Sequence, residues 1–269
     1  MRKLATLTSA LALAATAASA QEVVNVYNWS DYVAEDTISN FEAQTGIKVV
    51  YDVFDSNEVL EAKMLTGASG YDVVFPSMEF LARQAQAGVF AEIDKAALSN
   101  YGNLDPAVLA IVAELDPDNA HAVPYMSYST GIGYNVEAIE KRLDEDEIGS
   151  WDMLFNPDTA AKLADCGIAI LDSPTEVFAP VLNWLGLDPN SEDSGDLDKA
   201  VAVMKDLRPH VRYFHSSQYI NDLANGDICI TLGYSGDIMQ ARDRAAEVGQ
   251  PFTIAYLIPR EGAQIGFDM

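Results

Sequence analysis

The chain has 269 residues and a formal net charge of −25, because 41 acidic side chains outnumber 16 basic ones. Such a surface repels nucleic acid and anionic membranes and attracts cations, although acidity also serves solubility in exported proteins. Aromatic and β-branched residues occur throughout, which excludes a disordered chain, and the length favours one large domain or two lobes.

Residues 1–20 have the pattern of a secretory signal peptide. Arg2 and Lys3 precede the apolar run 4–18, and Ala18-Ser19-Ala20 forms an A-x-A cleavage site. We therefore expect cleavage after Ala20 and a periplasmic location. The run is too short to cross a bilayer, and no later segment reaches the roughly 18 apolar residues that a span requires, so we expect no membrane insertion.

Strand-like and helix-like segments alternate in the first half of the chain. The predicted strands are 23–27, 47–54 and 71–75. Helices are predicted at 35–44, from the capping residue Ser56 to about 66, and from Ser77 to Gly88. Three successive strand–helix units predict an α/β fold with a parallel, doubly wound sheet.

Residues 121–136 contain two extended, Gly- and Pro-punctuated pieces, which we interpret as a crossover to a second lobe. The helices expected after it are 151–155, 175–185, 197–207 and 218–225. The strands expected there are 167–171, 211–214, 228–232 and 252–258, and 189–196 is the most loop-like internal stretch. The sequence stops at Phe267-Asp268-Met269 without a cap, so we expect a truncated coding sequence.

The segment Tyr27-Asn28-Trp29-Ser30-Asp31-Tyr32 directly follows the first predicted strand. In α/β folds ligands bind beyond the carboxyl ends of the strands. Aromatic faces attract a cation and a carboxylate accepts its N–H bonds, so the segment favours a small organic cation as ligand. The alternative is a strand end with interfacial aromatics.

Three later strands are also followed by hydroxyl, carboxylate or aromatic side chains. The segments are Pro76-Ser77-Met78-Glu79, Asp172-Ser173-Pro174-Thr175-Glu176 and Gly233-Tyr234-Ser235-Gly236-Asp237. Helix capping explains each segment by itself, Ser77 included. Four such loops with more aromatics than capping requires favour a shared binding site.

Catalytic and cofactor motifs are incomplete. Gly233-Tyr234-Ser235-Gly236 is one residue short of a nucleophile elbow, and the three histidines lack a zinc-binding spacing. Gly131-Ile132-Gly133 lacks the third glycine of a dinucleotide fingerprint. We therefore predict no enzyme activity, no cofactor and no metal. An exported hydrolase using Ser235 remains the rival of a different class.

The only two cysteines are Cys166 and Cys229. In an oxidising compartment a single disulfide between them is the default expectation. It would close a loop of about 60 residues and contribute roughly 3–5 kcal/mol in the chain-entropy model.

The run from Val24 to Asp268 resembles the periplasmic polyamine-binding receptors of ABC transporters, most closely the putrescine receptors. The resemblance is carried by residues 27–32, 51–58, 130–135 and 213–227. It implies a two-lobed periplasmic-binding-protein fold of type II, with a mixed, mostly parallel sheet flanked by helices in each lobe and a missing C-terminal part. It also implies hinge closure over the ligand. Residues 21–132 plus 259–269 would form lobe 1, and 133–258 lobe 2.

The resemblance also implies the binding residues and partners. The pocket positions that carry over are Trp29, Ser30, Asp31, Tyr32, Ser77, Glu176, Tyr234, Asp237 and Asp268. Carboxylates at each end would hold a diamine and aromatic rings would enclose its methylene stem. The implied partners are a polyamine and a membrane permease, and we expect a monomer. The family pairs cysteines at the positions of Cys166 and Cys229.

The chain departs from the family at several pocket positions. Tyr234 stands where tryptophan is expected, and Gly266 replaces an aromatic wall. Glu79 adds a carboxylate, and Ser173 lies near the same region. These departures predict a larger pocket that accepts a longer polyamine such as spermidine.

A receptor for a cationic amino acid or a betaine-like cation is the other alternative. An amino-acid receptor needs an arginine in its pocket for the ligand carboxylate. Arg83, Arg208 and Arg212 are predicted to lie away from the ligand loops.

Overall fold

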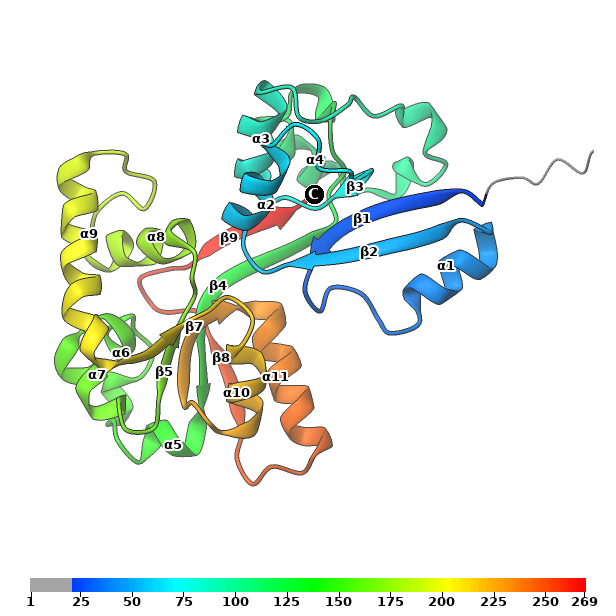
Figure 1. Cartoon of the computed structure of the whole chain (residues 1–269). Coiled ribbons are helices and arrows are strands. Elements are labelled where there is room, and N and C mark those ends of the chain that lie inside the picture. The colour runs from blue at the N-terminus through cyan, green and yellow to red at the C-terminus, as the bar shows by residue number, and fades with distance from the viewer. Residues whose placement is uncertain (1–20) are drawn as a thin grey trace, which may run out of the picture.

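The computed structural model describes residues 21–269 and has two lobes (Figure 1). One contains the three-stranded sheet β2-β1-β3, and the other the sheet β6-β5-β7-β4-β8, to which β9 adds by pairing with β4. The strands β4 (Met126–Asn135) and β9 (Gln264–Asp268) run between the lobes. The predicted two-lobed α/β fold is confirmed, and the predicted signal peptide, residues 1–20, lies outside the described residues.

The first sheet is entirely parallel, as predicted. The strand β1 (Val23–Trp29) lies between β2 (Lys48–Phe54) and the short β3 (Val73–Val74). The helices here are α1 (Thr37–Thr45), α2 (Asn57–Met64), α3 (Met78–Gln86) and α4 (Pro106–Val112). The side chain of Ser56 accepts a hydrogen bond from the Val59 N–H and so caps α2, as its sequence predicts.

The second sheet is mixed, and here the prediction of mostly parallel strands is wrong. Its other strands are β5 (Ile168–Ile170), β6 (Val211–Phe214), β7 (Ile230–Tyr234) and β8 (Ile254–Leu257). The strand β5 is parallel to β6 and β7, but β4 is antiparallel to β7, β8 and β9. The strand β4 also forms one continuous strand and not the two extended pieces that were predicted.

Close packing explains the two glycines that resemble breaks in β4. A Cβ added at Gly131 would lie 2.6 Å from the carbonyl oxygen of Leu257 on β8. One added at Gly133 would lie 2.1 Å from Ile238 Cδ1. These glycines therefore allow neighbouring elements to approach β4 closely and do not interrupt the strand.

Seven helices lie in the described second lobe, and the sequence predicted only some of them. They are α5 (Val136–Glu140), α6 (Asp152–Phe155), α7 (Pro157–Leu163), α8 (Pro174–Trp184), α9 (Ser194–Leu207), α10 (Tyr219–Asn225) and α11 (Ser235–Glu247). The helix α9 begins inside the predicted loop because Asp193 accepts bonds from the N–H groups of Gly195 and Asp196. The helix α11 was not predicted, because residues 233–237 at its start were interpreted as a ligand loop.

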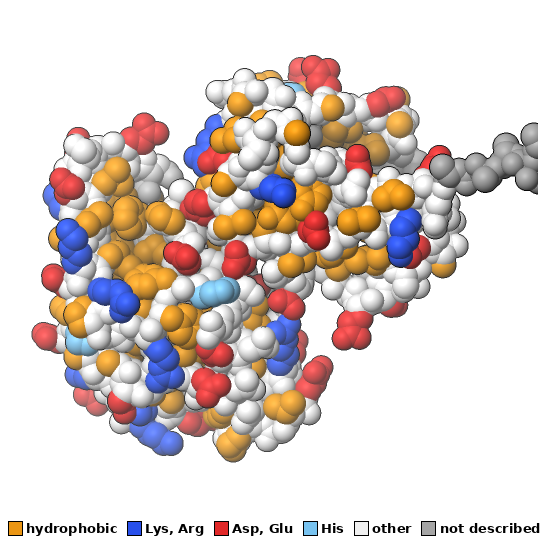
Figure 2. All heavy atoms as spheres, viewed as in Figure 1, with side chains coloured by type: hydrophobic (Ala, Val, Ile, Leu, Met, Phe, Trp, Pro, Cys, Tyr) orange, Lys and Arg blue, Asp and Glu red, His pale blue; other side chains and the backbone are white. Residues whose placement is uncertain are grey.

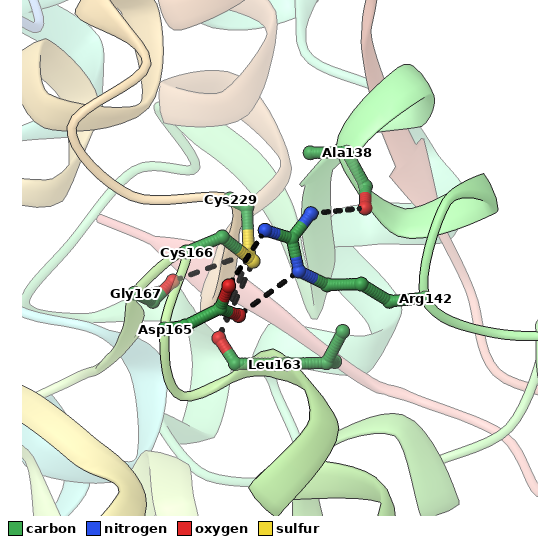
Figure 3. Close-up of polar contacts among 7 residues, drawn as sticks. All are labelled: Ala138, Arg142, Leu163, Asp165, Cys166, Gly167 and Cys229. Atoms are coloured by element: carbon green, nitrogen blue, oxygen red, sulfur yellow. Dashed lines mark hydrogen bonds and ion pairs between the residues drawn. A yellow bond between two sulfur atoms is a disulfide. The ribbon is translucent and has the colours of Figure 1, made fainter.

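The larger core lies in the second lobe, where side chains such as Trp151, Phe155 and Tyr219 are fully buried. The predicted disulfide between Cys166 and Cys229 is present, with a Cα–Cα distance of 5.4 Å. Beside it, Arg142 donates two hydrogen bonds of 2.9 Å to the carboxylate of Asp165 (Figure 3). Within residues 21–269 no helix is both long and apolar enough to cross a bilayer.

Candidate functional site

Acidic side chains gather where the two lobes approach each other (Figure 2). A cavity at this junction is lined by Trp29, Ser30, Tyr32, Phe54, Asp55, Tyr128, Ser216, Ser217, Ile220, Tyr234, Asp237 and Asp268. The lining therefore includes six of the nine pocket residues that the resemblance implied. The cavity volume is about 20 Å³, which is room for roughly one water molecule.

The carboxylate of Asp268 lies at the end of β9 and is fully buried. Its two oxygens each accept a bond of 2.7 Å, one from Ser77 Oγ and one from the Tyr32 hydroxyl. Burial raises its pKa to about 6, the charge of Glu79 adds to the increase, and the two hydrogen bonds oppose it. A bound cation would lower this pKa again, because a positive charge nearby favours the ionised carboxylate.

Ser77 does not cap α3 with its side chain, so the capping interpretation of this residue is wrong. The hydroxyl of Ser77 instead donates to Asp268 and accepts a 2.8 Å bond from Asn57 Nδ2. Ser77 therefore orients the carboxylate of Asp268 at the cavity but does not itself line the cavity.

Asp237 supplies a second buried carboxyl from the first turn of α11. Its Oδ2 accepts a 2.6 Å bond from the hydroxyl of Tyr219. Burial raises the pKa of Asp237 to about 7; the negative charges of Asp31 and Asp268 raise it further, while the Tyr219 bond and the Arg244 guanidinium oppose the increase. The cavity therefore carries two carboxyls that change charge near neutral pH.

Glu176 is buried in the first turn of α8 but does not line this cavity. It accepts bonds of 2.6 Å from Thr130 Oγ1 and 3.1 Å from the Tyr128 hydroxyl. Burial raises its pKa to about 7 against these two bonds. Glu176 lines a neighbouring groove of about 800 Å³, together with Glu79 and Phe178. It therefore lies behind Tyr128 as viewed from the cavity.

Aromatic rings form walls of the cavity, as predicted for an organic cation. The centroid of Trp29 lies 6.0 Å from that of Tyr32 and 6.2 Å from that of Tyr234. The rings of Tyr128 and Tyr234 meet edge to face at 5.4 Å. These faces can attract a cation while they cover its apolar part.

The structure places Asp31 differently from the implied pocket position. Its carboxylate accepts a 2.7 Å bond from Arg244, an arginine of α11 that the sequence analysis did not consider, and it does not line the cavity. Asp31 also has a positive φ of 60°, an uncommon backbone conformation that turns the chain after β1. An ion pair across the lobes therefore takes the place of the expected ligand contact.

Ser173, a predicted specificity residue, also connects the lobes. Its hydroxyl donates to the carboxylate of Glu58 on α2 at 3.0 Å, and Thr175 donates to the same carboxylate at 3.1 Å. Ser173 lines neither the cavity nor the groove.

The predicted enlargement of the pocket at Gly266 is wrong. Gly266 pairs with Tyr128 across the β4–β9 ladder, and an added Cβ would lie 2.3 Å from Tyr128 Cζ. The ring of Tyr128 therefore occupies the space that a side chain at position 266 would enter.

Eight residues at the site were not predicted. Six of them line the cavity: Phe54, Asp55, Tyr128, Ser216, Ser217 and Ile220. The other two, Tyr219 and Arg244, bond to Asp237 and Asp31. A signal for Tyr128 lies in its spacing: it precedes Thr130, the first residue of the block 130–135, by two, and residues two apart on one strand share a face. No comparable signal marks Arg244, whose partner Asp31 lies in the other lobe. Among residues 21–269 no group of three or more His, Cys, Asp or Glu side chains is arranged to hold a metal ion.

Residues 36–269 match the model of the bacterial extracellular solute-binding protein family. The chain is 53% identical over 256 residues to the putrescine-binding periplasmic protein PotF of Escherichia coli (strain K12), which covers 94% of this chain and 69% of PotF. It is 50% identical over 253 residues to the putrescine-binding periplasmic protein SpuD of Pseudomonas aeruginosa (strain UCBPP-PA14), with the same coverage of both chains.

A solved structure, a putative spermidine/putrescine ABC transporter protein from Listeria monocytogenes, superposes with a TM-score of 0.79 at 28% identity. The match covers 92% of this chain and 71% of that protein. These findings confirm the resemblance inferred from residues 27–32 and 213–227. The chain belongs to the family of bacterial extracellular solute-binding proteins.

Proposed function

We propose that this protein is a periplasmic receptor that binds a polyamine, with putrescine as its first candidate, and delivers it to an ABC permease. The observation that carries the proposal is the pair of buried carboxyls, Asp237 and Asp268, in one aromatic cavity at the junction of the lobes. A diamine offers an ammonium group for each carboxylate and a methylene stem for the rings.

Two acids distinguish a diamine from the other organic cations considered. A betaine-like cation would use the aromatic walls but carries only one positive charge, so the second buried carboxyl would contribute no charge-assisted hydrogen bond to its binding. An amino acid would need an arginine for its carboxylate. Arg244 is the candidate for such an arginine, but its guanidinium already forms an ion pair with Asp31.

Binding requires the lobes to part, since the cavity has room for about one water molecule. We propose that β4 and β9, the two strands that run between the lobes, flex as the hinge. The proposed division is residues 21–132 plus 259–269 for lobe 1 and 133–258 for lobe 2, which puts a boundary within β4. The contacts of Asp31 with Arg244 and of Ser173 with Glu58 would break on opening.

The proposed ligand contacts are Trp29, Ser30, Tyr32, Ser77, Tyr234, Asp237 and Asp268. The hydroxyls that now donate to the two carboxyls would share them with the ligand ammonium groups. Export after removal of residues 1–20 would bring the receptor to the compartment in which its relatives are named as periplasmic proteins.

The test is the thermal shift of the purified protein with putrescine, spermidine, lysine and glycine betaine. A ligand present at 100 times its Kd stabilises a protein by about 2.7 kcal/mol, which is several degrees in Tm. We expect stabilisation by the polyamines and none by lysine or betaine. Stabilisation by lysine or betaine alone would refute the proposal.

A further inference from the structure

At one wall of the cavity, the aromatic ring comes from Tyr128 on β4, which lies opposite Gly266 on β9. The resemblance places an aromatic side chain at position 266 of β9, but this chain has Gly266 there. Its ladder partner on β4 is Tyr128, whose ring lies where a side chain at 266 would project, 2.3 Å from the position of the missing Cβ. The aromatic wall is therefore supplied by the opposite strand.

Tyr128 also differs from a purely apolar wall because it carries a hydroxyl. This oxygen lies 3.1 Å from Glu176 Oε1 and 3.3 Å from Ser77 Oγ, and its one proton is donated to one of them. Ser77 in turn donates to Asp268. The side chain of Tyr128 is buried and is thus held by polar contacts on two sides.

The side chain of Tyr128 contacts residues of two acidic spaces. The cavity on one side contains Asp237 and Asp268, and the groove on the other contains Glu79 and Glu176. Tyr128 lines the cavity and bonds to Glu176, which lines only the groove. The groove, at about 800 Å³, is far larger than the cavity.

We propose that Tyr128 is a specificity-determining residue that sets the length of the ligand, by separating the diamine cavity from the acidic groove. This inference rests on the proposed polyamine function. Once the lobes have parted, with the ring in place, a diamine would span Asp237 and Asp268, and the additional aminopropyl arm of a triamine would meet the ring. Without it, the cavity and the groove join, and the third ammonium group reaches Glu79 and Glu176.

The experiment measures Kd for putrescine and spermidine by isothermal titration calorimetry on the wild type and on Tyr128→Ala. We expect Tyr128→Ala to shift the ratio of the two affinities towards spermidine by about tenfold or more, the scale on which pocket shape discriminates ligands. Tyr128→Phe keeps the ring and is expected to keep the wild-type ratio within about threefold.

Two further variants exclude a general loss of packing. Tyr134→Ala removes a ring from the same strand outside the cavity and should leave the ratio unchanged. The double variant Tyr128→Ala with Gly266→Phe returns a ring from the other strand and should restore the wild-type ratio. If Tyr128→Ala does not fold, Tyr128→Leu provides a shorter wall and should give a smaller shift in the same direction.

The outcomes separate this inference from the function on which it rests. A wild type that binds neither amine overturns both. A wild type that binds a polyamine, with a ratio that neither Tyr128→Ala nor Tyr128→Leu changes, overturns only the role of Tyr128. An equal shift in Tyr134→Ala does the same.

Discussion

The affinity for a diamine should depend steeply on pH because the two cavity carboxyls must ionise to bind it. The pKa of Asp237 is raised to about 7 and that of Asp268 to about 6. Both amines of putrescine stay protonated throughout this range, as alkyl ammonium groups titrate near pH 10. The protein, and not the ligand, therefore changes charge between pH 6 and 8.

The magnitude follows from linkage. A carboxyl with a pKa of about 7 that must be ionised in the complex weakens binding about tenfold between pH 8 and pH 6. One with a pKa of about 6 weakens it about twofold over the same interval. Together Asp237 and Asp268 predict a loss of about 20-fold, or about 1.8 kcal/mol, as the pH falls from 8 to 6. Binding at pH 7 should release about 0.6 proton.

The stability of the ligand-free protein should move in the opposite direction. Carboxyls with raised pKa values hold protons in the folded state that the unfolded chain gives up near pH 4. Their stabilising contribution is therefore complete below about pH 4 and is lost as the pH rises through about 6 to 7. The free energy of unfolding without ligand should decrease across this window while the affinity for putrescine increases.

Calorimetric titration with putrescine at pH 6, 7 and 8, in buffers of different ionisation enthalpy, gives both the affinity and the number of protons released. The matched control is Asp243→Asn on the same helix as Asp237, at a side chain that is 64% exposed. It should keep the wild-type pH dependence, whereas Asp237→Asn should lose most of it. Affinity that is constant from pH 6 to 8, without proton release, would refute the reasoning.

Three further predictions concern packing and the contacts between lobes. Replacing Cys166 and Cys229 with serine should lower the stability by about 2–4 kcal/mol in chemical denaturation, and an unchanged midpoint would contradict a structural role for the disulfide. Gly131→Ala should lower the free energy of unfolding by about 1–3 kcal/mol, since the new Cβ would meet the Leu257 backbone oxygen. The control is Gly236→Ala in α11, which should not destabilise the protein because nothing lies within 4 Å of the added Cβ. Arg244→Ala removes a half-exposed ion pair with Asp31, so the affinity for putrescine should fall by less than about fivefold, and more at low salt. The same variant should move the midpoint of the pH dependence upward, because Arg244 opposes the raised pKa of Asp237; a downward shift in calorimetry would contradict this.

Features set by local sequence were predictable. The parallel first sheet follows from three strand–helix units, and Ser56 caps α2 as its position before the helix indicates. Trp29, Tyr32 and Tyr234 were found because ligand loops follow strands in this fold class, and the structure brings all three to one cavity.

Features that depend on pairing between distant segments could not be predicted. The ring of Tyr128 fills the space beside Gly266 because the register of β4 against β9 places these two residues opposite each other. Asp31 was assigned to the ligand because it lies in the loop after the first strand; its partner Arg244 could not be foreseen, since it lies in the other lobe on a helix that was not predicted. Local sequence patterns indicate candidate side chains, but only the folded structure shows which of them form hydrogen bonds and ion pairs with one another.

We propose that Asp237 and Asp268 bind a dication in the cavity between the lobes. The most direct test is calorimetric titration of putrescine into the wild type, Asp268→Asn and the exposed-site control Asp243→Asn at pH 8. We expect one putrescine per wild-type chain, unchanged binding in the control, and a loss of at least about tenfold in Asp268→Asn, because a buried charge-assisted hydrogen bond is lost. Equal affinity in Asp268→Asn and the wild type would show that Asp268 does not bind the ligand.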